Sequence, residues 1–204
     1  MKDNIQIVMY FLEEGFYNPS KVAAAINTQF EDIGDPVILP FNNNAPKEAN
    51  IPNLIFSQNQ DFQIISNYQN ISIILSGKYI EKYKDIIEKT YDIYSDDNKY
   101  SRIGYVTTEI LPPDKIEEIK NKYFKEEKVI TSKDFQLSWL SNIEIASRTI
   151  NCWQRYISDI TGGKINGLIS IFDFNTMPKE KTELTKEYIM AFIEECNDYR
   201  NQNK

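Results

Sequence analysis

The stretch NIQIVMYFL at residues 4–12 is apolar on both of its alternating faces. In an extended chain, Ile5, Ile7, Met9 and Phe11 lie on one side, and the side chains between them are also mostly apolar. A strand that can be buried on both faces is typical of the middle of a sheet. We therefore predict a central strand at residues 4–12.

A helix is predicted directly after this strand. Gly15 provides a turn, and Asn18-Pro19 is a typical helix start, because asparagine caps free amides and proline has no amide to leave unpaired.

Residues 53–75 alternate between apolar and polar over short runs, and the apolar residues of 78–94 then recur at helical spacing. They predict strands at 53–57, 61–67 and 70–75 and a helix at 78–94.

The order of elements then repeats after the turn at Ser95-Asp96-Asp97-Asn98. The pattern predicts a strand at 100–110, a helix from Pro112, a hairpin of strands 134–140 and 143–157, a strand at 167–174 and a helix at 182–200. We predict an α+β fold of two strand–helix–strands–helix halves, residues 1–97 and 98–204. Their largely antiparallel strands would carry helices on one face, and strand 143–157 could join both halves into one continuous domain.

No histidine occurs among the 204 residues. Histidine is the commonest general base and metal ligand, so its absence argues against Ser-His-Asp and Cys-His catalysis and against imidazole-bound metals. Cys152 and Cys196 lack the spacing of a metal or redox motif and indicate reduced thiols. We expect no catalytic residue, no metal and no cofactor.

The charge of the chain is acidic and uneven. The net charge is −7, and residues 1–100 hold 8 Lys/Arg against 14 Asp/Glu. Such a balance repels phosphate backbones and anionic lipid, which disfavours general nucleic-acid binding and attachment to a membrane. The expected partner is another protein, and a basic or nucleic-acid-binding one fits the charge.

The candidate functional residues are few. Trp139, Arg148, Trp153 and Arg155 fall on the predicted hairpin strands, and tryptophan and arginine are enriched at binding hot spots. The tract Asn42-Asn43-Asn44 predicts a partner-contacting loop. Asp173 shares a strand face with Ile169, Ile171 and Asn175, so we expect an ion pair with Arg102 or Arg148.

Three segments of the second half resemble an uncharacterised, sporadically distributed bacterial protein family. They are Arg102-Ile103-Gly104, the strand with Arg148 and Asn151, and the closing stretch GLISIFDFNTMPKEKTELTKEYIMAFIEECNDYRNQ at 167–202. The opening IQIVMYFLE at 5–13 also fits. The resemblance implies a two-part α+β fold and carries no known activity or catalytic residue.

We expect a non-enzymatic, cytoplasmic protein of a bacterium or phage that binds and modulates another protein. A toxin-neutralising immunity protein and an inhibitor of a defence nuclease are examples of this class. Two alternatives stay open. One is a histidine-free enzyme that relies on carboxylates such as Asp96, Asp97 and Asp173. The other is a sensor that binds a small molecule or nucleotide between the two halves.

Overall fold

The computed structural model of the protein describes residues 3–13, 15, 17–40, 51–124, 134–161, 164–177 and 182–203. Its strands are β1 (Asn4–Phe11), β2 (Val37–Ile38), β3 (Leu54–Phe56), β4 (Phe62–Ser66), β5 (Asn70–Ser76), β6 (Tyr100–Leu111), β7 (Gln136–Ile145), β8 (Arg148–Thr161) and β9 (Lys164–Thr176). Its helices are α1 (Pro19–Gln29), the 3₁₀ helix η2 (Gly77–Lys82), α2 (Tyr83–Ser95), α3 (Asp114–Tyr123) and α5 (Lys186–Gln202).

All nine strands form one antiparallel sheet in the order β2-β3-β4-β5-β1-β6-β9-β8-β7. The α+β class and the antiparallel sheet predicted from the sequence are confirmed. β1 lies between β5 and β6, as its two apolar faces predicted. The strands of the first half and those of the second half each stay together, and the pairing of β1 with β6 joins them.

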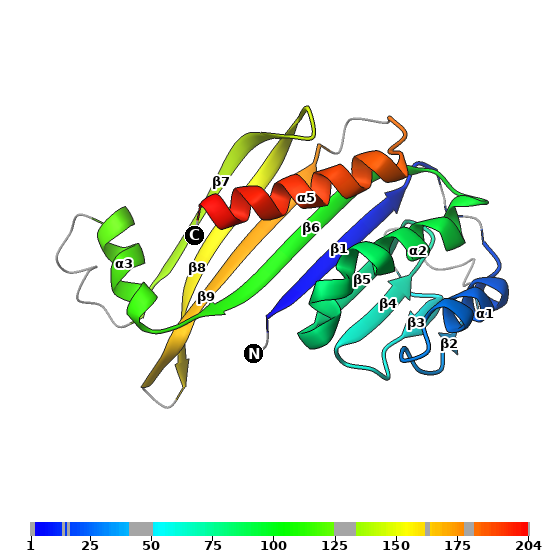
Figure 1. Ribbon diagram of the computed structural model, residues 1–204, viewed down its shortest axis with the longest axis horizontal. Helices are drawn as coiled ribbons and strands as arrows, with labels where there is room; N and C mark the ends of the chain where they lie inside the picture. Colours follow the sequence, from blue (N-terminus) through cyan, green and yellow to red (C-terminus); the bar gives the residue numbers. More distant parts are fainter. Residues whose placement is uncertain are drawn as a thin grey trace.

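Helices pack on one face of this sheet (Figure 1). The main core lies between the sheet and α1, α2 and α5, because every second strand residue is buried beneath them. In β1 this buried set is Ile5, Ile7, Met9 and Phe11, which the sequence placed on one side of the strand. A smaller core lies under α3, where Ile116 and Ile119 meet Tyr156 and Leu168 from the same face of the sheet.

The helix boundaries follow the expected physical signals with two differences. The Asn18 side chain accepts the amides of Ser20 and Lys21 and Pro19 opens α1, as predicted. The predicted helix at 78–94 begins instead as η2 and becomes α-helical only at Tyr83. The last helix, predicted from residue 182, begins instead at Lys186, where the Thr185 hydroxyl accepts the amide of Tyr188.

The hairpin of the second half turns at a different place from the one predicted. The sequence suggested a turn at Ser141-Asn142, whereas β7 continues to Ile145 and turns at Ala146-Ser147. Both turn residues have positive φ, 48° and 61°, a conformation that the pair Asn-Gly usually signals. The expectation that strand 143–157 spans both halves is also wrong, because β8 pairs only with β7 and β9, next to the sheet edge.

Candidate binding surface

The face of the sheet opposite these helices, called here the open face, carries mostly half-buried side chains. No described helix packs on this face. Every second side chain of β6, β8 and β9 lies on it, next to the exposed side chains of β7. In the second half these side chains are Arg102, Val106, Thr108, Ile110, Gln136, Ser138, Leu140, Asn142, Asn151, Trp153, Arg155, Ile157, Ile169, Ile171, Asp173 and Asn175.

One group on this face, called here the Trp153 patch, consists of Leu140, Trp153, Arg155 and Asp173. Leu140 and Asp173 are the cross-strand partners of Trp153 in β7 and β9, so the three side chains stand in one row. Leu140 is 47% exposed and Trp153 is 38% exposed, unusually high values for large apolar side chains. The Arg155 guanidinium lies 5.6 Å from the Trp153 ring. The patch therefore combines apolar area with one charge of each sign.

The Asp173 carboxylate is oriented by a neighbour on its own strand. The Asn175 amide donates a hydrogen bond to Asp173, and the Asn175 carbonyl oxygen lies over Gly104 of β6. A Cβ at Gly104 would lie only 2.8 Å from that oxygen. The shared face of Asp173, Ile169, Ile171 and Asn175 agrees with the sequence prediction.

The four candidate residues of the predicted hairpin separate onto the two faces of the sheet. Trp153 and Arg155 lie together on the open face. Trp139 lies on the helix face, with ring centroids 5.0 Å from Tyr123 and 5.9 Å from Tyr156. Arg148 also lies on the helix face, 4.4 Å above the Tyr188 ring of α5. Of these four residues, Trp153 and Arg155 are therefore the two that belong to the open face.

The expected ion pair between Asp173 and Arg102 or Arg148 is a wrong prediction. Arg148 lies on the opposite face of the sheet from Asp173. Arg102 shares the open face, but the register aligns Asp173 with Val106, four residues and about 13 Å further along β6. Arg102 instead lies 4.8 Å above the Tyr10 ring.

The sequence predictions differ from the candidate site in two further ways, one about a loop and one about Leu140. The predicted contact loop Asn42-Asn43-Asn44 lies outside the described residues. Leu140 was missed from the sequence because it ended the predicted strand 134–140, beside a turn placed at Ser141-Asn142. The alternation of residues 136–139 resumes in the same phase at 142–145, which was the available signal, but Ala146-Ser147 contains no glycine, asparagine or aspartate to mark the true turn.

A cavity of about 210 Å³ lies on the helix side, between elements of the two halves. Its lining comes from β1, η2 and α2 of the first half and from β6 and α5 of the second: Ile5, Ile80, Tyr83, Tyr105, Asn197, Arg200 and Asn201. The Nε of Arg200 is buried and has no hydrogen-bond partner. The Tyr105 hydroxyl donates to Asn197 at 2.8 Å, and burial raises the pKa of Tyr105 although Arg200 opposes the rise.

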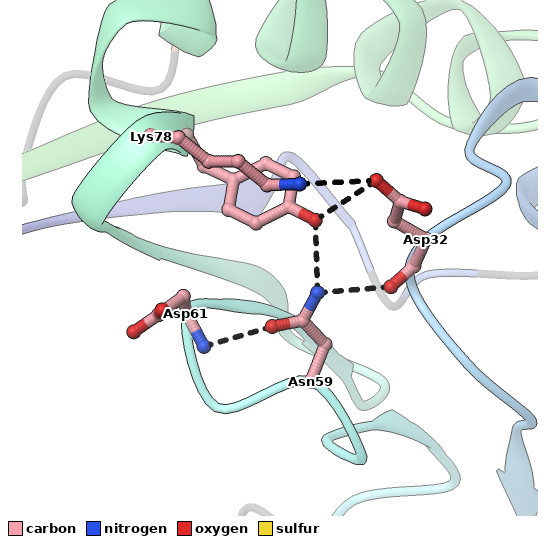
Figure 2. Close-up of polar contacts among 5 residues, drawn as sticks. Asp32, Asn59, Asp61 and Lys78 are labelled. Atoms are coloured by element: carbon pink, nitrogen blue, oxygen red, sulfur yellow. Dashed lines mark hydrogen bonds and ion pairs between the residues drawn. The ribbon is translucent and has the colours of Figure 1, made fainter.

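A polar cluster connects the segment after α1 to the β3–β4 turn and to η2 (Figure 2). The Asn59 amide donates at 2.9 Å both to the Asp32 carbonyl oxygen and to the Tyr79 hydroxyl, and Lys78 pairs with Asp32 at 3.4 Å. Asn59 in turn accepts the amide of Asp61 at 3.0 Å. Since these polar groups bond to one another, we interpret the cluster as a hydrogen-bond network that stabilises the fold.

Of the residues named for carboxylate or thiol chemistry, Asp96 and Asp97 lie at a helix end and the two cysteines lie in the core. Asp96 and Asp97 are exposed at the end of α2. Within the described ranges, no three Cys, Asp or Glu side chains converge in a way that could hold a metal ion. Cys152 and Cys196 are free and fully buried, and burial raises the pKa of Cys152 to about 11, so its thiol stays protonated at neutral pH.

No known family model matches this chain, and no curated protein matches it either. The resemblance to an uncharacterised bacterial family therefore stays a prediction. None of the described helices has both the length and the apolar content that crossing a membrane requires.

Proposed function

We propose that this protein is a non-enzymatic binding module, of bacterial or phage origin, that modulates a second protein by docking through the Trp153 patch. The observation that carries the proposal is the adjacent exposure of Trp153 and Leu140 on a sheet face that no described helix covers. Tryptophan and arginine dominate the energy of protein interfaces, and exposed apolar area beside them is the usual centre of such a site.

The proposed partner is basic on the surface that meets this protein. The chain carries a net charge of −7, which speeds the approach of a positively charged protein. A partner that binds nucleic acid has such a surface. The first classes to test are a toxin that this protein neutralises in the cytoplasm and a nuclease of bacterial defence that it inhibits.

Replacement Trp153→Ala is expected to weaken partner binding about 30-fold, or about 2 kcal/mol, because truncating a central tryptophan removes a hot spot. The partner would first be identified by co-purification from the native host and mass spectrometry, and its Kd then measured with each purified variant. Tyr10→Ala is the matched control, since it removes a half-buried aromatic ring from the same face on β1. It should change Kd less than threefold. Equal affinity of wild type and Trp153→Ala would reject the patch as the binding site.

The junction cavity supports a second candidate function, the binding of a small anion. A volume of about 210 Å³ is below the roughly 300 Å³ at which pockets for drug-sized ligands begin, so a nucleotide fits poorly. A compact carboxylate can pair with the guanidinium of Arg200, which lines the cavity, and place its apolar part against Ile5 and Ile80.

Benzoate at a concentration far above its Kd is expected to raise the thermal unfolding midpoint by about 5 °C, because ligand binding to the folded state alone stabilises it. The same titration with inorganic phosphate tests for an anion without an apolar body. Arg200→Gln should abolish the shift while leaving the midpoint without ligand nearly unchanged. No shift in the wild type, or the same shift in Arg200→Gln, would eliminate this function.

A further inference from the structure

β7 forms one edge of the sheet, and half of its main-chain groups face outward. The two-residue turn makes Ile145 and Arg148 a hydrogen-bonded pair, so the odd-numbered residues of β7 bond to β8. The Phe135 carbonyl oxygen, which accepts the amide of Ser158 at 3.1 Å, follows the same parity. The amides and carbonyls that point away from the sheet therefore belong to Gln136, Ser138, Leu140, Asn142 and Glu144, and among the described residues none of these main-chain groups has a hydrogen-bond partner.

The two edges of the sheet differ in their protection against pairing. β2 at the other edge is only two residues long and lies between Pro36 and Pro40, which cannot donate to a neighbouring strand. β7 is ten residues long and contains no proline, no lysine and one charged residue, Glu144. Long edges of this composition pair readily with another strand.

We propose that β7 pairs with β7 of a second copy of this chain, antiparallel and about a two-fold axis at Leu140. This inference goes beyond the proposed function, because it concerns the outer edge of β7 rather than the partner that docks on the open face. The axis stands perpendicular to the sheet, so both copies keep their helices on the same side. The two sheets then become one, joined by about ten hydrogen bonds between the outward groups.

The side chains of β7 favour a second copy as the occupant. With Leu140 opposite Leu140, Ser138 meets Asn142 and Gln136 meets Glu144, so no like charges oppose one another. A shift of the register by two residues would instead place Leu140 opposite Asn142 or Ser138. The preferred register also extends the Trp153 patch, because Trp153, Leu140 and their two-fold mates form a continuous apolar row across the junction.

Leu140→Cys tests the register directly by oxidative cross-linking with copper–phenanthroline. Residues opposite one another in a hydrogen-bonded antiparallel pair have Cα atoms about 5.5 Å apart, which suits a disulfide. We expect a covalent dimer of twice the 23.9 kDa chain mass from this variant. The wild type should give none, because Cys152 and Cys196 are fully buried.

Ser138→Cys provides the register control. Its two copies would lie about 13 Å apart in this register, so the variant alone should not cross-link. Mixing Ser138→Cys with Asn142→Cys should restore the covalent dimer, because these positions oppose one another. Equal cross-linking of Ser138→Cys alone would show random collision and would overturn the proposal.

Analytical ultracentrifugation across a dilution series gives the second measurement. The wild type should reach twice the monomer mass at high concentration, whereas Leu140→Lys should stay monomeric because two lysines would oppose each other. Ile74→Lys, on the same face but on β5, should dimerise as the wild type does. A wild type that stays monomeric throughout would reject the dimer and would leave the Trp153→Ala test of the proposed function unaffected.

Discussion

Above pH 10 the protein is expected to unfold cooperatively, with a midpoint between about pH 11 and 12. The cause is a set of tyrosines whose rings and hydroxyls lie in the main core. Tyr17, Tyr94, Tyr100 and Tyr105 are each at most 5% exposed. Burial raises the pKa of Tyr17 to about 12 and raises the pKa values of the other three further above the ordinary value of 10.

The sign of the effect follows from the protons that each state holds. Below pH 10 both the folded and the unfolded chain keep these phenol protons, so stability does not depend on them. Above pH 10 only the unfolded chain releases them, and each tyrosine then lowers the free energy of unfolding by about 1.4 kcal/mol per pH unit. Four such tyrosines lower it by about 6 kcal/mol per unit, whereas a whole domain is stable by only 5–15 kcal/mol.

Circular dichroism and the tyrosinate absorbance at alkaline pH measure this transition together. Loss of secondary structure and ionisation of the buried tyrosines should coincide in one steep step. Gradual ionisation with the fold intact would contradict the prediction.

Tyr100→Phe is the informative variant for this transition. The Tyr100 hydroxyl is buried without a hydrogen-bond partner, so its removal costs no contact and relieves about 1 kcal/mol at neutral pH. The alkaline midpoint should therefore rise. Tyr94→Phe is the control, because it loses the 2.9 Å hydrogen bond to Ser66 and should be less stable than the wild type at pH 7.

Gly167→Ala is expected to lower the free energy of unfolding by about 3 kcal/mol, and with it the thermal midpoint by about 9 °C. A Cβ at Gly167 would lie 2.6 Å from the Leu111 carbonyl oxygen and 3.2 Å from an Ile110 methyl group. The oxygen belongs to the main chain of β6, whose residue Leu111 is the register partner of Leu168. Relief therefore requires the end of the β6–β9 ladder to move.

Gly104→Ala is the matched control for this substitution. The nearest atom to its added Cβ is the Asn175 side-chain oxygen at 2.8 Å, and that side chain can rotate away at a half-buried position. Its cost should stay within about 1 kcal/mol, partly because alanine restricts the unfolded chain more than glycine does. Urea titrations of both variants measure the difference. Equal destabilisation would show that strand propensity, rather than the clash with the main chain, determines the effect.

Much of the fold could be predicted because its signals are local. The two apolar faces of residues 4–12 predicted a central strand, and Asn18-Pro19 predicted the start of α1. The hairpin turn escaped prediction because Ala146-Ser147 adopts positive φ without the residues that normally favour it. This error also concealed Leu140, the most exposed member of the candidate site.

The candidate site depended on information that the sequence does not contain locally. Trp139 and Trp153 look equivalent along the chain, but the register of β7 on β8 sends them to opposite faces. Asp173 and Arg102 share a face and still do not meet. The register of β9 on β6 places Asp173 beside Val106, four residues from Arg102. Strand register, which decides both outcomes, is fixed by contacts between distant segments.

The amino-acid sequence by itself determined the succession of strands and helices, the buried side of each, the acidic charge and the lack of any imidazole. These properties depend on side chains a few positions apart or on composition alone. Only the tertiary structure decided the strand order, the face on which Trp153 is exposed and the position of β7 at an edge of the sheet. These three features depend on which distant strands pair. The alternation of side chains along a single strand does not reveal its neighbours, because it is the same beside any of them.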